Sequence, residues 1–277
     1  FIMEKRRKIR VGILFGGKSA EHEVSLRSAK NVYEALDKEK YEPILIGIDK
    51  RGKWLLEDRS RFLLESGTAL KEERGESVAL VPQSDGAITN FERPSASEKI
   101  DVVFPVLHGT FGEDGTVQGL LKLANIPFVG AGVLGSAIGM DKDVMKRILR
   151  DAGIPIAKFK TFRGNDEISF DEVLEGLGVP LFVKPANLGS SVGVHKTRTE
   201  EEFRAAVRDA FTYDRKILVE EYIKGREIEC SVLGNEEPIA SLAGEVIPTH
   251  EFYSYEAKYI DEDGAALEIP AKLPGET

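Results

Sequence analysis

Cysteine is almost missing from this chain: Cys230 is the only one among 277 residues, which also include just four histidines. One cysteine cannot form an intrachain disulfide, and histidines without a paired Cys/His spacing argue against a structural zinc site. No apolar run reaches the length of a membrane-spanning helix, and the three apolar residues at the start are too few for a signal peptide. We therefore expect a soluble protein of the reducing cytoplasm, with no membrane partner.

The chain also has fewer basic than acidic residues: 38 Lys and Arg and 47 Asp and Glu give a formal net charge of −9. An acidic chain is a poor general binder of nucleic acid, although it can still hold a local basic pocket for an anion. What the sequence does have is length. With 42% hydrophobic residues, 277 residues suffice for two or three compact units.

The amino-terminal part has the pattern of a parallel β-sheet. Residues 9–15 and 101–107 are near-continuous apolar runs, typical of strands buried on both faces. Between them the spacing of apolar residues predicts a helix from Ser25 and a strand at 41–48. Ligands of such sheets bind beyond the carboxyl ends of the strands, so the segments after residues 15 and 107 are candidate binding segments.

The later part predicts a smaller α+β unit. Asp141 can cap a helix that ends at Gly153, and Thr199 with Glu202 forms a capping box for another helix. The other predicted elements are strands at 158–162, 180–184, 216–223, 227–233 and 239–246 and a helix at 170–177. The predicted fold class is therefore α/β, with a parallel-sheet domain followed by a small α+β domain.

Residues 12–19 match the phosphate-binding pattern G-x-x-x-x-G-K-[ST]. In a working P-loop the variable residues wrap the phosphate, whereas here the three apolar residues from Ile13 continue the strand. Glu21 and Glu23 would place carboxylates at the positive end of the next helix, where they would repel a polyphosphate. We therefore interpret the match as coincidental. The same placement suits an ammonium group, so Glu21 is a candidate for binding a substrate amine, with plain helix-terminal charge as the alternative.

A second glycine-flanked loop follows the strand that ends near Lys184. Gly189 and Gly193 permit backbone angles closed to other residues, and Ser190 and Ser191 supply hydroxyl and N–H groups. Such a loop can wrap phosphates or can be an ordinary hairpin turn, and its composition leaves both open.

Other charged residues could complete a nucleotide site around that loop. Lys142 begins a helix and could bracket a triphosphate together with Lys184. Glu220 and Glu227 end and begin successive strands, a spacing that could present acceptors to an adenine amine and a ribose hydroxyl. Each of these residues alone is more often a solvated surface charge.

Taken together, six segments closely resemble the D-alanine–D-alanine ligases of the ATP-grasp superfamily. They are residues 15–25 (FGGKSAEHEVS), 107–115 (LHGTFGEDG), 140–142 (MDK), 183–193 (VKPANLGSSVG), 220–227 (EEYIKGRE) and 255–259 (YEAKY). One such match would be weak, but six in the family's order across nearly the whole chain displace the P-loop interpretation.

The resemblance implies an ATP-grasp fold and a reaction that uses ATP and Mg²⁺. In that reaction the carboxylate of one D-alanine is phosphorylated, and the amine of a second D-alanine attacks the acyl phosphate. The products are D-alanyl-D-alanine, ADP and phosphate, and the dipeptide serves peptidoglycan synthesis. The resemblance further implies a homodimer.

The resemblance also assigns roles to individual residues. The predicted catalytic residues are Glu21 for the ammonium group of the first D-alanine, His108 beside its carboxylate, and Ser190 and Tyr259, which close the site with Glu21. The predicted nucleotide-binding residues are Lys142, Lys184 and Ser191 for the phosphates, Lys258 for the transferring phosphate, Glu220 and Glu227 for adenine and ribose, and Glu221 and Ile223 along the pocket. The loop that contains Tyr259 is expected to be mobile, to shield the acyl phosphate, and to favour D-alanine over D-lactate or D-serine.

Three domains follow from the resemblance. They are a substrate-binding domain (1–128), a central ATP-grasp lid domain (129–218) and a C-terminal ATP-grasp domain (219–277) with the mobile loop at about 247–264. Because the family's Mg²⁺ ligands and an oxyanion-stabilising arginine are expected beyond Thr277, the resemblance predicts a C-terminally incomplete chain with no metal ligands and little or no ligase activity. The alternatives are another ATP-grasp carboxylate–amine ligase and a nucleotide-binding chain without activity.

Overall fold

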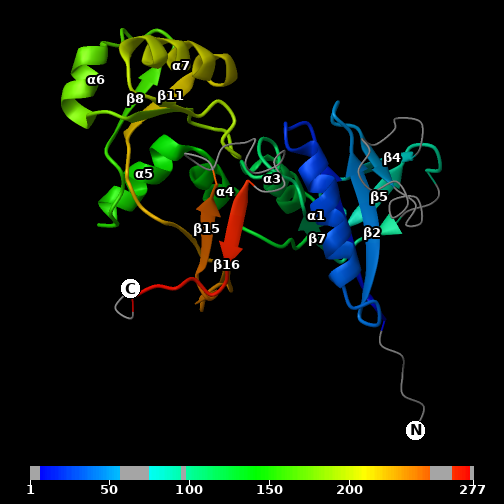
Figure 1. The fold of residues 1–277 in the computed structure, drawn as a ribbon. Helices are drawn as coiled ribbons and strands as arrows, with labels where there is room; N and C mark the ends of the chain where they lie inside the picture. Colours follow the sequence, from blue (N-terminus) through cyan, green and yellow to red (C-terminus); the bar gives the residue numbers. More distant parts are fainter. Residues whose placement is uncertain (1–6, 57–74, 95–97, 250–263, 275–277) are drawn as a thin grey trace. The chain divides into compact units, whose positions relative to one another are not determined.

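The computed structural model describes residues 7–56, 75–94, 98–249 and 264–274, and the chain forms two compact units (Figure 1). Unit 1 is Phe1–Ile148 and unit 2 is Leu149–Thr277. Within the described ranges, no helix is both long and apolar enough to cross a membrane. The three-domain division stays a prediction.

Unit 1 is built on a seven-stranded sheet with the order β6-β5-β4-β3-β2-β1-β7. Its parallel strands are β1 (Ile9–Gly16), β2 (Tyr41–Ile48) and β7 (Val102–Pro105), with β1 in the middle. Its antiparallel strands are β3 (Trp54–Leu56), β4 (Glu76–Leu80), β5 (Ala87–Asn90) and β6 (Glu98–Lys99). The sheet is therefore mixed rather than wholly parallel. The reason for the change in direction after β2 is the connection at residues 49–53, which is too short to join two parallel strands.

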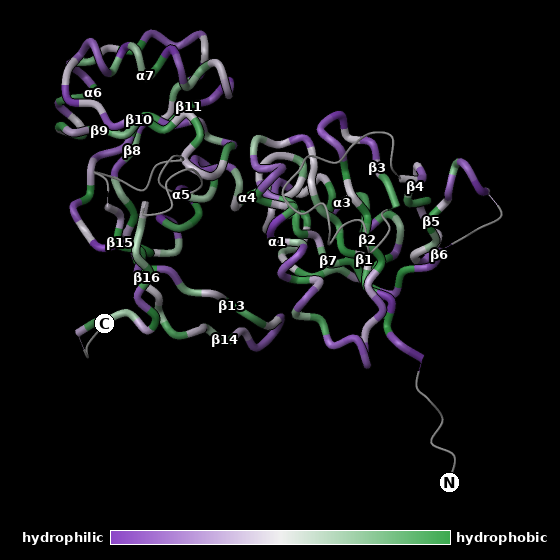
Figure 2. The backbone as a smooth tube through the Cα atoms, turned by 45° about the vertical axis from the view of Figure 1, so that its right-hand side comes forward, coloured by the Kyte–Doolittle hydropathy of each residue, from purple (hydrophilic) through white to green (hydrophobic). Residues whose placement is uncertain are grey.

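Helices cover both faces of the parallel strands. Helix α1 (His22–Ala35) packs on the face that carries Ile13 and Phe15, whereas α3 (Thr116–Leu123) packs on the face that carries Leu14. Alternate residues of β1 thus enter two different apolar clusters. This double burial explains the unbroken apolar run in the sequence, and the hydrophobic colouring of β1 and β2 in Figure 2 follows it.

The sheet of unit 1 curves so that its first strand in the order, β6, comes close to β1. Strands β6 and β7 lie at opposite ends of the strand order, yet only Ile100 and Asp101 separate them along the chain. The bend presses Ile100 against the middle of β1, where a Cβ atom on Gly12 would lie 2.6 Å from Cδ1 of Ile100. A larger residue at position 12 would therefore force these strands apart.

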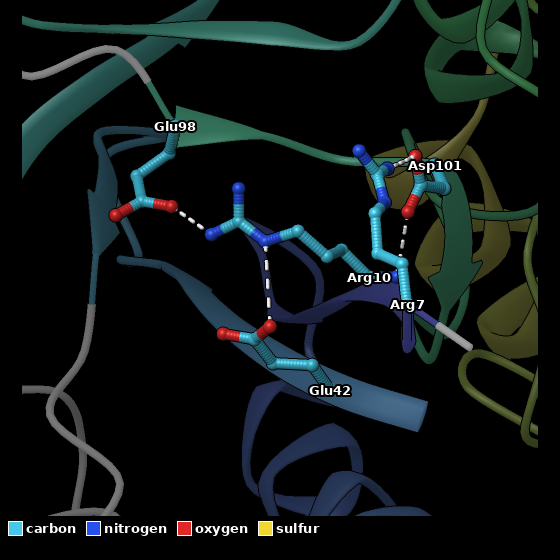
Figure 3. Close-up of polar contacts among 5 residues, drawn as sticks. All are labelled: Arg7, Arg10, Glu42, Glu98 and Asp101. Atoms are coloured by element: carbon cyan, nitrogen blue, oxygen red, sulfur yellow. Dashed lines mark hydrogen bonds and ion pairs between the residues drawn. The ribbon is translucent and has the colours of Figure 1, made fainter. Parts of the chain in front are cut away.

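Charged side chains also connect β6 to β1 and β2, as Figure 3 shows. The guanidinium group of Arg10 on β1 forms ion pairs with Glu98 of β6 and, at 3.8 Å, with Glu42 of β2. The backbone N–H of Arg10 donates to Asp101 at 2.8 Å, and Asp101 also pairs with Arg7. We refer to these five residues as the Arg10 clasp. It connects three strands that are distant in the sequence.

Unit 2 contains a four-stranded antiparallel sheet with the order β10-β9-β11-β8. Its strands are β8 (Phe159–Arg163), β9 (Leu181–Pro185), β10 (His195–Thr197) and β11 (Lys216–Glu221), and its helices are α6 (Phe170–Leu177) and α7 (Glu200–Tyr213). Both helices pack on one face, as Figure 1 shows, and bury an apolar cluster that includes Val183, Phe203 and Val219. The capping box of Thr199 and Glu202 is confirmed at the start of α7.

The remaining elements are short. They are α4 (Val133–Met140), α5 (Lys142–Asp151), β12 (Glu227–Glu229), β13 (Val232–Leu233), β14 (Ile239–Ala240), β15 (Gly244–Pro248) and β16 (Ala265–Glu268). The antiparallel pair predicted for 227–233 and 239–246 is confirmed, but it is divided into two ladders, β12 with β15 and β13 with β14.

Candidate active site

Ser25 of α1 joins the carboxyl ends of β1 and β7. Its Oγ accepts a hydrogen bond from the N–H of Gly16 at 2.8 Å and donates one to the carbonyl oxygen of Val106. The side chain is fully buried, so both bonds are shielded from water. This one hydroxyl therefore fixes the loops that follow two neighbouring parallel strands, where ligands of such sheets bind.

The turn after β1 requires glycine. Gly16 and Gly17 have φ of +87° and +96°, and a Cβ atom on Gly16 would lie 2.3 Å from the carbonyl oxygen of Ile48. Gly17 donates its N–H to that same oxygen at 2.7 Å. Ile13, which a P-loop would need in its phosphate-wrapping turn, lies fully buried inside β1. The interpretation of the P-loop match as coincidental is confirmed.

Glu21 lies at this edge of the sheet as the N-cap residue of α1 and is 6% exposed. Its carboxylate packs against the loop after β7, because a Cβ atom on Gly109 would lie 2.6 Å from Oε2 of Glu21. Gly109 has φ of +71°, and its N–H donates to Oε2 of Glu113 at 2.7 Å. A carboxylate held here is favoured by the positive end of α1 and is suited to bind an ammonium group.

His108 is half-buried in the same loop. Its Nε2 lies 3.3 Å from Oγ of Ser28, one turn along α1 from Ser25. The structure thus brings two of the predicted catalytic residues, Glu21 and His108, to one edge of unit 1. Their roles stay predictions.

Sequence reasoning missed His22 and Ser25. His22 is 1% exposed, and its Nδ1 lies 2.7 Å from the carbonyl oxygen of Gly17. Because a carbonyl only accepts, Nδ1 carries the proton, and Nε2 has no hydrogen-bond partner among the described residues. Both residues fall inside the motif at 15–25, but their contacts are with backbone atoms that no spacing rule identifies.

In unit 2, Lys184 and Glu220 occupy one face of the four-stranded sheet. Neighbouring residues of β9 and β11, such as Val183 and Val219, face the helices, so Lys184 and Glu220 point to the opposite face. Their side chains form an ion pair and are 21% and 8% exposed. A residue predicted to bind phosphate and a residue predicted to bind adenine are therefore in direct contact.

The loop between β9 and β10 is a hairpin connection in its backbone, since the two strands are antiparallel neighbours. Ser190 and Ser191 have φ of +49° and +60°, in the left-handed region that costs about 1–2 kcal/mol for a non-glycine residue. Asn187 anchors the loop, because its N–H and Nδ2 both donate to Oδ2 of Asp214, at 2.8 and 2.9 Å. Strain of this kind occurs at ligand-binding loops.

The other predicted nucleotide-binding residues are more dispersed. Glu221 accepts a hydrogen bond from the N–H of Lys158 at 2.7 Å, Ile223 is 61% exposed, and Glu227 begins β12. Lys142 is the first residue of α5 and belongs to unit 1. The bracketing of a triphosphate by Lys142 and Lys184 therefore stays a prediction.

Two of the predicted site residues, Lys258 and Tyr259, lie outside the described residues, as does most of the loop expected at about 247–264. The expected set of Glu21, Ser190 and Tyr259 accordingly stays a prediction. No group of three or more His, Cys, Asp or Glu side chains that could hold a metal ion occurs in the described part of the chain.

Two family models match this chain. The model described as "D-ala D-ala ligase N-terminus" matches residues 10–131, and the model described as "D-ala D-ala ligase C-terminus" matches residues 148–277. Together they reach into both units. The expectation that the chain is inactive is not supported, because the C-terminal model matches in addition to the N-terminal one.

Named relatives agree with these matches. The chain is 56% identical to a D-alanine–D-alanine ligase of Oceanobacillus iheyensis, covering 96% of this chain and 74% of the relative. It is 53% identical to D-alanine–D-alanine ligase A of Escherichia coli K12, covering 97% of this chain and 76% of the relative.

Solved structures of such ligases have a similar fold. The D-alanine–D-alanine ligase of Coxiella burnetii superposes with a TM-score of 0.84 at 39% identity, over 97% of this chain and 73% of that one. The D-Ala:D-Ser ligase VanG of Enterococcus faecalis superposes with a TM-score of 0.82 at 35% identity, over 98% and 78%.

Proposed function

The chain belongs to the D-alanine–D-alanine ligase family, and on this premise we propose that it joins two D-alanine molecules to D-alanyl-D-alanine in an ATP-dependent reaction. The observation that carries the proposal is the pair of family models, which match residues 10–131 and 148–277. The dipeptide would serve peptidoglycan synthesis. We propose that the enzyme acts in the cytoplasm and that it assembles as a homodimer.

Unit 1 would bind the first D-alanine. Glu21 would accept hydrogen bonds from its ammonium group, because the carboxylate is buried and fixed against Gly109. His108 would lie beside the substrate carboxylate, held by its contact with Ser28. Ser25 and the Gly16–Gly17 turn would keep these groups at a constant separation, which is how positioning lowers a barrier.

Unit 2 would bind ATP, and its residues fit that ligand. Lys184 offers an ammonium group on the face of the sheet that the helices leave open, and Ser190 and Ser191 add hydroxyl and N–H donors in the adjoining loop. When bound, ATP supplies the phosphoryl group that activates a carboxylate. Ser190, with Tyr259, would face the D-alanine site, whereas Ser191 and Lys258 would face the phosphates. Mg²⁺ is proposed from the family alone, since the described residues offer no cluster of metal ligands.

The division into domains is part of the proposal. A substrate-binding domain would extend over 1–128, a lid domain over 129–218 and the C-terminal ATP-grasp domain over 219–277. The four-stranded sheet and its two helices, from Phe159 to Glu221, favour a separate lid domain, with β11 extending three residues beyond the proposed boundary at 218.

The test is the reaction itself. The chain is incubated with ATP, Mg²⁺ and D-alanine, and ADP and D-alanyl-D-alanine are measured, with L-alanine as the control that should give neither product. D-serine and D-lactate are then offered as second substrates together with D-alanine. A mixed product made faster than the D-alanine dipeptide would overturn the proposed specificity. ATP binding without any dipeptide would favour a nucleotide-binding chain.

A further inference from the structure

Unit 1 has a pocket that borders the proposed D-alanine half-site and shares His108 with it. It encloses about 220 Å³ beyond the carboxyl ends of β1 and β2. Ile48, Trp54 and Leu107 form part of its wall, and Phe111 and Leu120 form another part. The lining is therefore mostly apolar, with two aromatic rings.

The centre of this pocket lies on the other side of β1 from the α1 helix that carries Glu21. Its described lining includes Val117 and Leu120 of α3 but no residue of α1, and Glu21 is not part of it. The pocket and the half-site share His108, and Gly17 also lines the pocket. A molecule bound in the pocket would thus lie on the α3 side of β1.

Lys18 gives the pocket a positive charge. Its ammonium group lies 5.1 Å from the centre of the Phe111 ring, and its stem packs over Gly52, where a Cβ atom would be 2.9 Å from Cδ of Lys18. None of the described residues that line the pocket is acidic, although the chain has 47 Asp and Glu and a net charge of −9. This local departure from the overall charge favours an anionic ligand.

The position of Phe111 is imposed by its backbone. Phe111 has φ of +66°, and its N–H donates to Oδ2 of Asp114 at 2.8 Å. Asp114 also accepts from the N–H of Thr116 at 3.0 Å. The two hydrogen bonds to Asp114 hold Phe111 in this strained backbone conformation, although the Phe111 side chain is 50% exposed. Strained residues of this kind are common at preorganised ligand sites.

The volume limits the ligand to one ring. An apolar cavity of about 150 Å³ holds benzene, so 220 Å³ leaves room for a six-membered ring with a short side arm. We propose that this pocket binds a small aromatic monocarboxylate, with its ring among Trp54, Leu107 and Leu120 and its carboxylate at Lys18. Such a ligand resembles neither ATP nor D-alanine.

The probe pair is 4-fluorophenylacetate and its uncharged amide, 4-fluorophenylacetamide. Binding to the whole chain is measured by the broadening of the fluorine NMR line and by quenching of Trp54, the only tryptophan in the sequence. We expect the carboxylate to bind at least about tenfold more tightly than the amide, because it gains a charge-assisted hydrogen bond. Saturating D-alanine should not displace it. Equal binding of the two probes, displacement by D-alanine, unchanged Trp54 emission or no binding at all would each overturn the proposal.

Two variants locate the site. Lys18→Met keeps the apolar stem and should abolish the preference for the carboxylate while leaving amide binding unchanged. Lys122→Met removes an exposed charge from α3 outside the pocket and should leave the preference intact. Leu120→Phe should fill the pocket and weaken both probes, with the thermal midpoint reporting whether the variant folds. Retention of the tenfold preference in Lys18→Met would refute the assignment even if Leu120→Phe fails to fold.

Discussion

Lys184 and Glu220 form an ion pair across β9 and β11, and the glutamate is almost completely buried. If Lys184 binds ATP phosphates as proposed, its ammonium group is shared between the phosphates and Glu220. The ion pair therefore connects the residue predicted to contact the phosphates with a residue predicted to contact adenine.

Replacing Lys184 by methionine should weaken ATP binding. It should also lower the free energy of unfolding by about 3 kcal/mol, because the buried Glu220 carboxylate loses this ion pair. In the double variant Lys184→Met with Glu220→Gln we expect stability to return but ATP affinity to stay low. Calorimetric titration with ATP and urea unfolding separate the two effects. Unchanged ATP affinity in the single variant would remove Lys184 from the nucleotide site.

Glu21→Gln should raise KM for D-alanine about 10- to 100-fold, since a hydrogen bond to a charged group contributes about 1.5–3 kcal/mol. ATP affinity should not change. Glu23→Gln is the matched control, two residues away, because Glu23 is exposed and pairs with Lys50 at 2.6 Å. Equal KM values for the two variants would argue that Glu21 is ordinary helix-terminal charge.

Gly109→Ala should displace the Glu21 carboxylate of the proposed D-alanine half-site. The new Cβ atom would lie 2.6 Å from the Glu21 carboxylate, and the backbone at φ of +71° disfavours alanine by about 1–2 kcal/mol. We expect a higher KM for D-alanine and a lower thermal midpoint. Gly119→Ala on α3 has open space around the added methyl group and should instead stabilise the helix by about 1 kcal/mol. A normal KM in Gly109→Ala would show that Glu21 can move without consequence.

Ser190 and Ser191 provide an internal comparison, since both have left-handed backbones and differ in predicted role. Ser190→Ala should lower the rate of dipeptide formation more than it lowers ATP affinity. Ser191→Ala should lower ATP affinity more than it lowers the rate of dipeptide formation. Steady-state kinetics and nucleotide titration of the two variants give the ranking. The reverse ranking would exchange the two assignments.

The Arg10 clasp predicts a pH dependence of stability. A hydrogen bond from the Arg10 N–H, together with the Arg7 guanidinium group, lowers the pKa of Asp101 despite some burial. Because this pKa is lower in the folded state, ionised Asp101 contributes to the free energy of unfolding. The contribution is fully present above the pKa of the unfolded state, about 3.9, and it is lost as the pH falls through the pKa of the folded state. Asp101→Asn should therefore lose less stability between neutral pH and about pH 3 than the parent chain does.

Urea unfolding at the two pH values measures this difference. Glu39→Gln, at an exposed position outside the clasp, should behave like the parent. Equal losses in Asp101→Asn and the parent would mean that Asp101 does not contribute to acid unfolding.

The sequence predicted the elements whose apolar residues follow a regular pattern. The strands at 9–15 and 41–48 are near-continuous apolar runs, and the helix at 170–177 has apolar residues at helical spacing. The mixed part of the sheet was not predicted, because β3 to β6 are two to five residues long and are held by distant partners, such as Ile100 against Gly12.

In the candidate site, too, contacts between distant parts of the chain could not be predicted from the sequence. Motif resemblance identified Glu21 and His108, which lie at one edge of unit 1. The contacts of His22 and Ser25 with backbone atoms could not be predicted, because they depend on how two loops meet. The pairing of Lys184 with Glu220 depends on the register of β9 and β11, which no motif contains.

The bend of the sheet in unit 1 also has a kinetic consequence. The hairpins β2–β3 and β4–β5 join residues that are close in sequence, whereas the contact of Arg10 with Asp101 closes a chain segment of 91 residues. The entropy of that closure costs about 4 kcal/mol before its contacts form. The β1–β7 ladder should therefore form late in folding. Because Glu21 and His108 lie beyond the ends of β1 and β7, we expect the proposed D-alanine half-site to form late in the folding of unit 1.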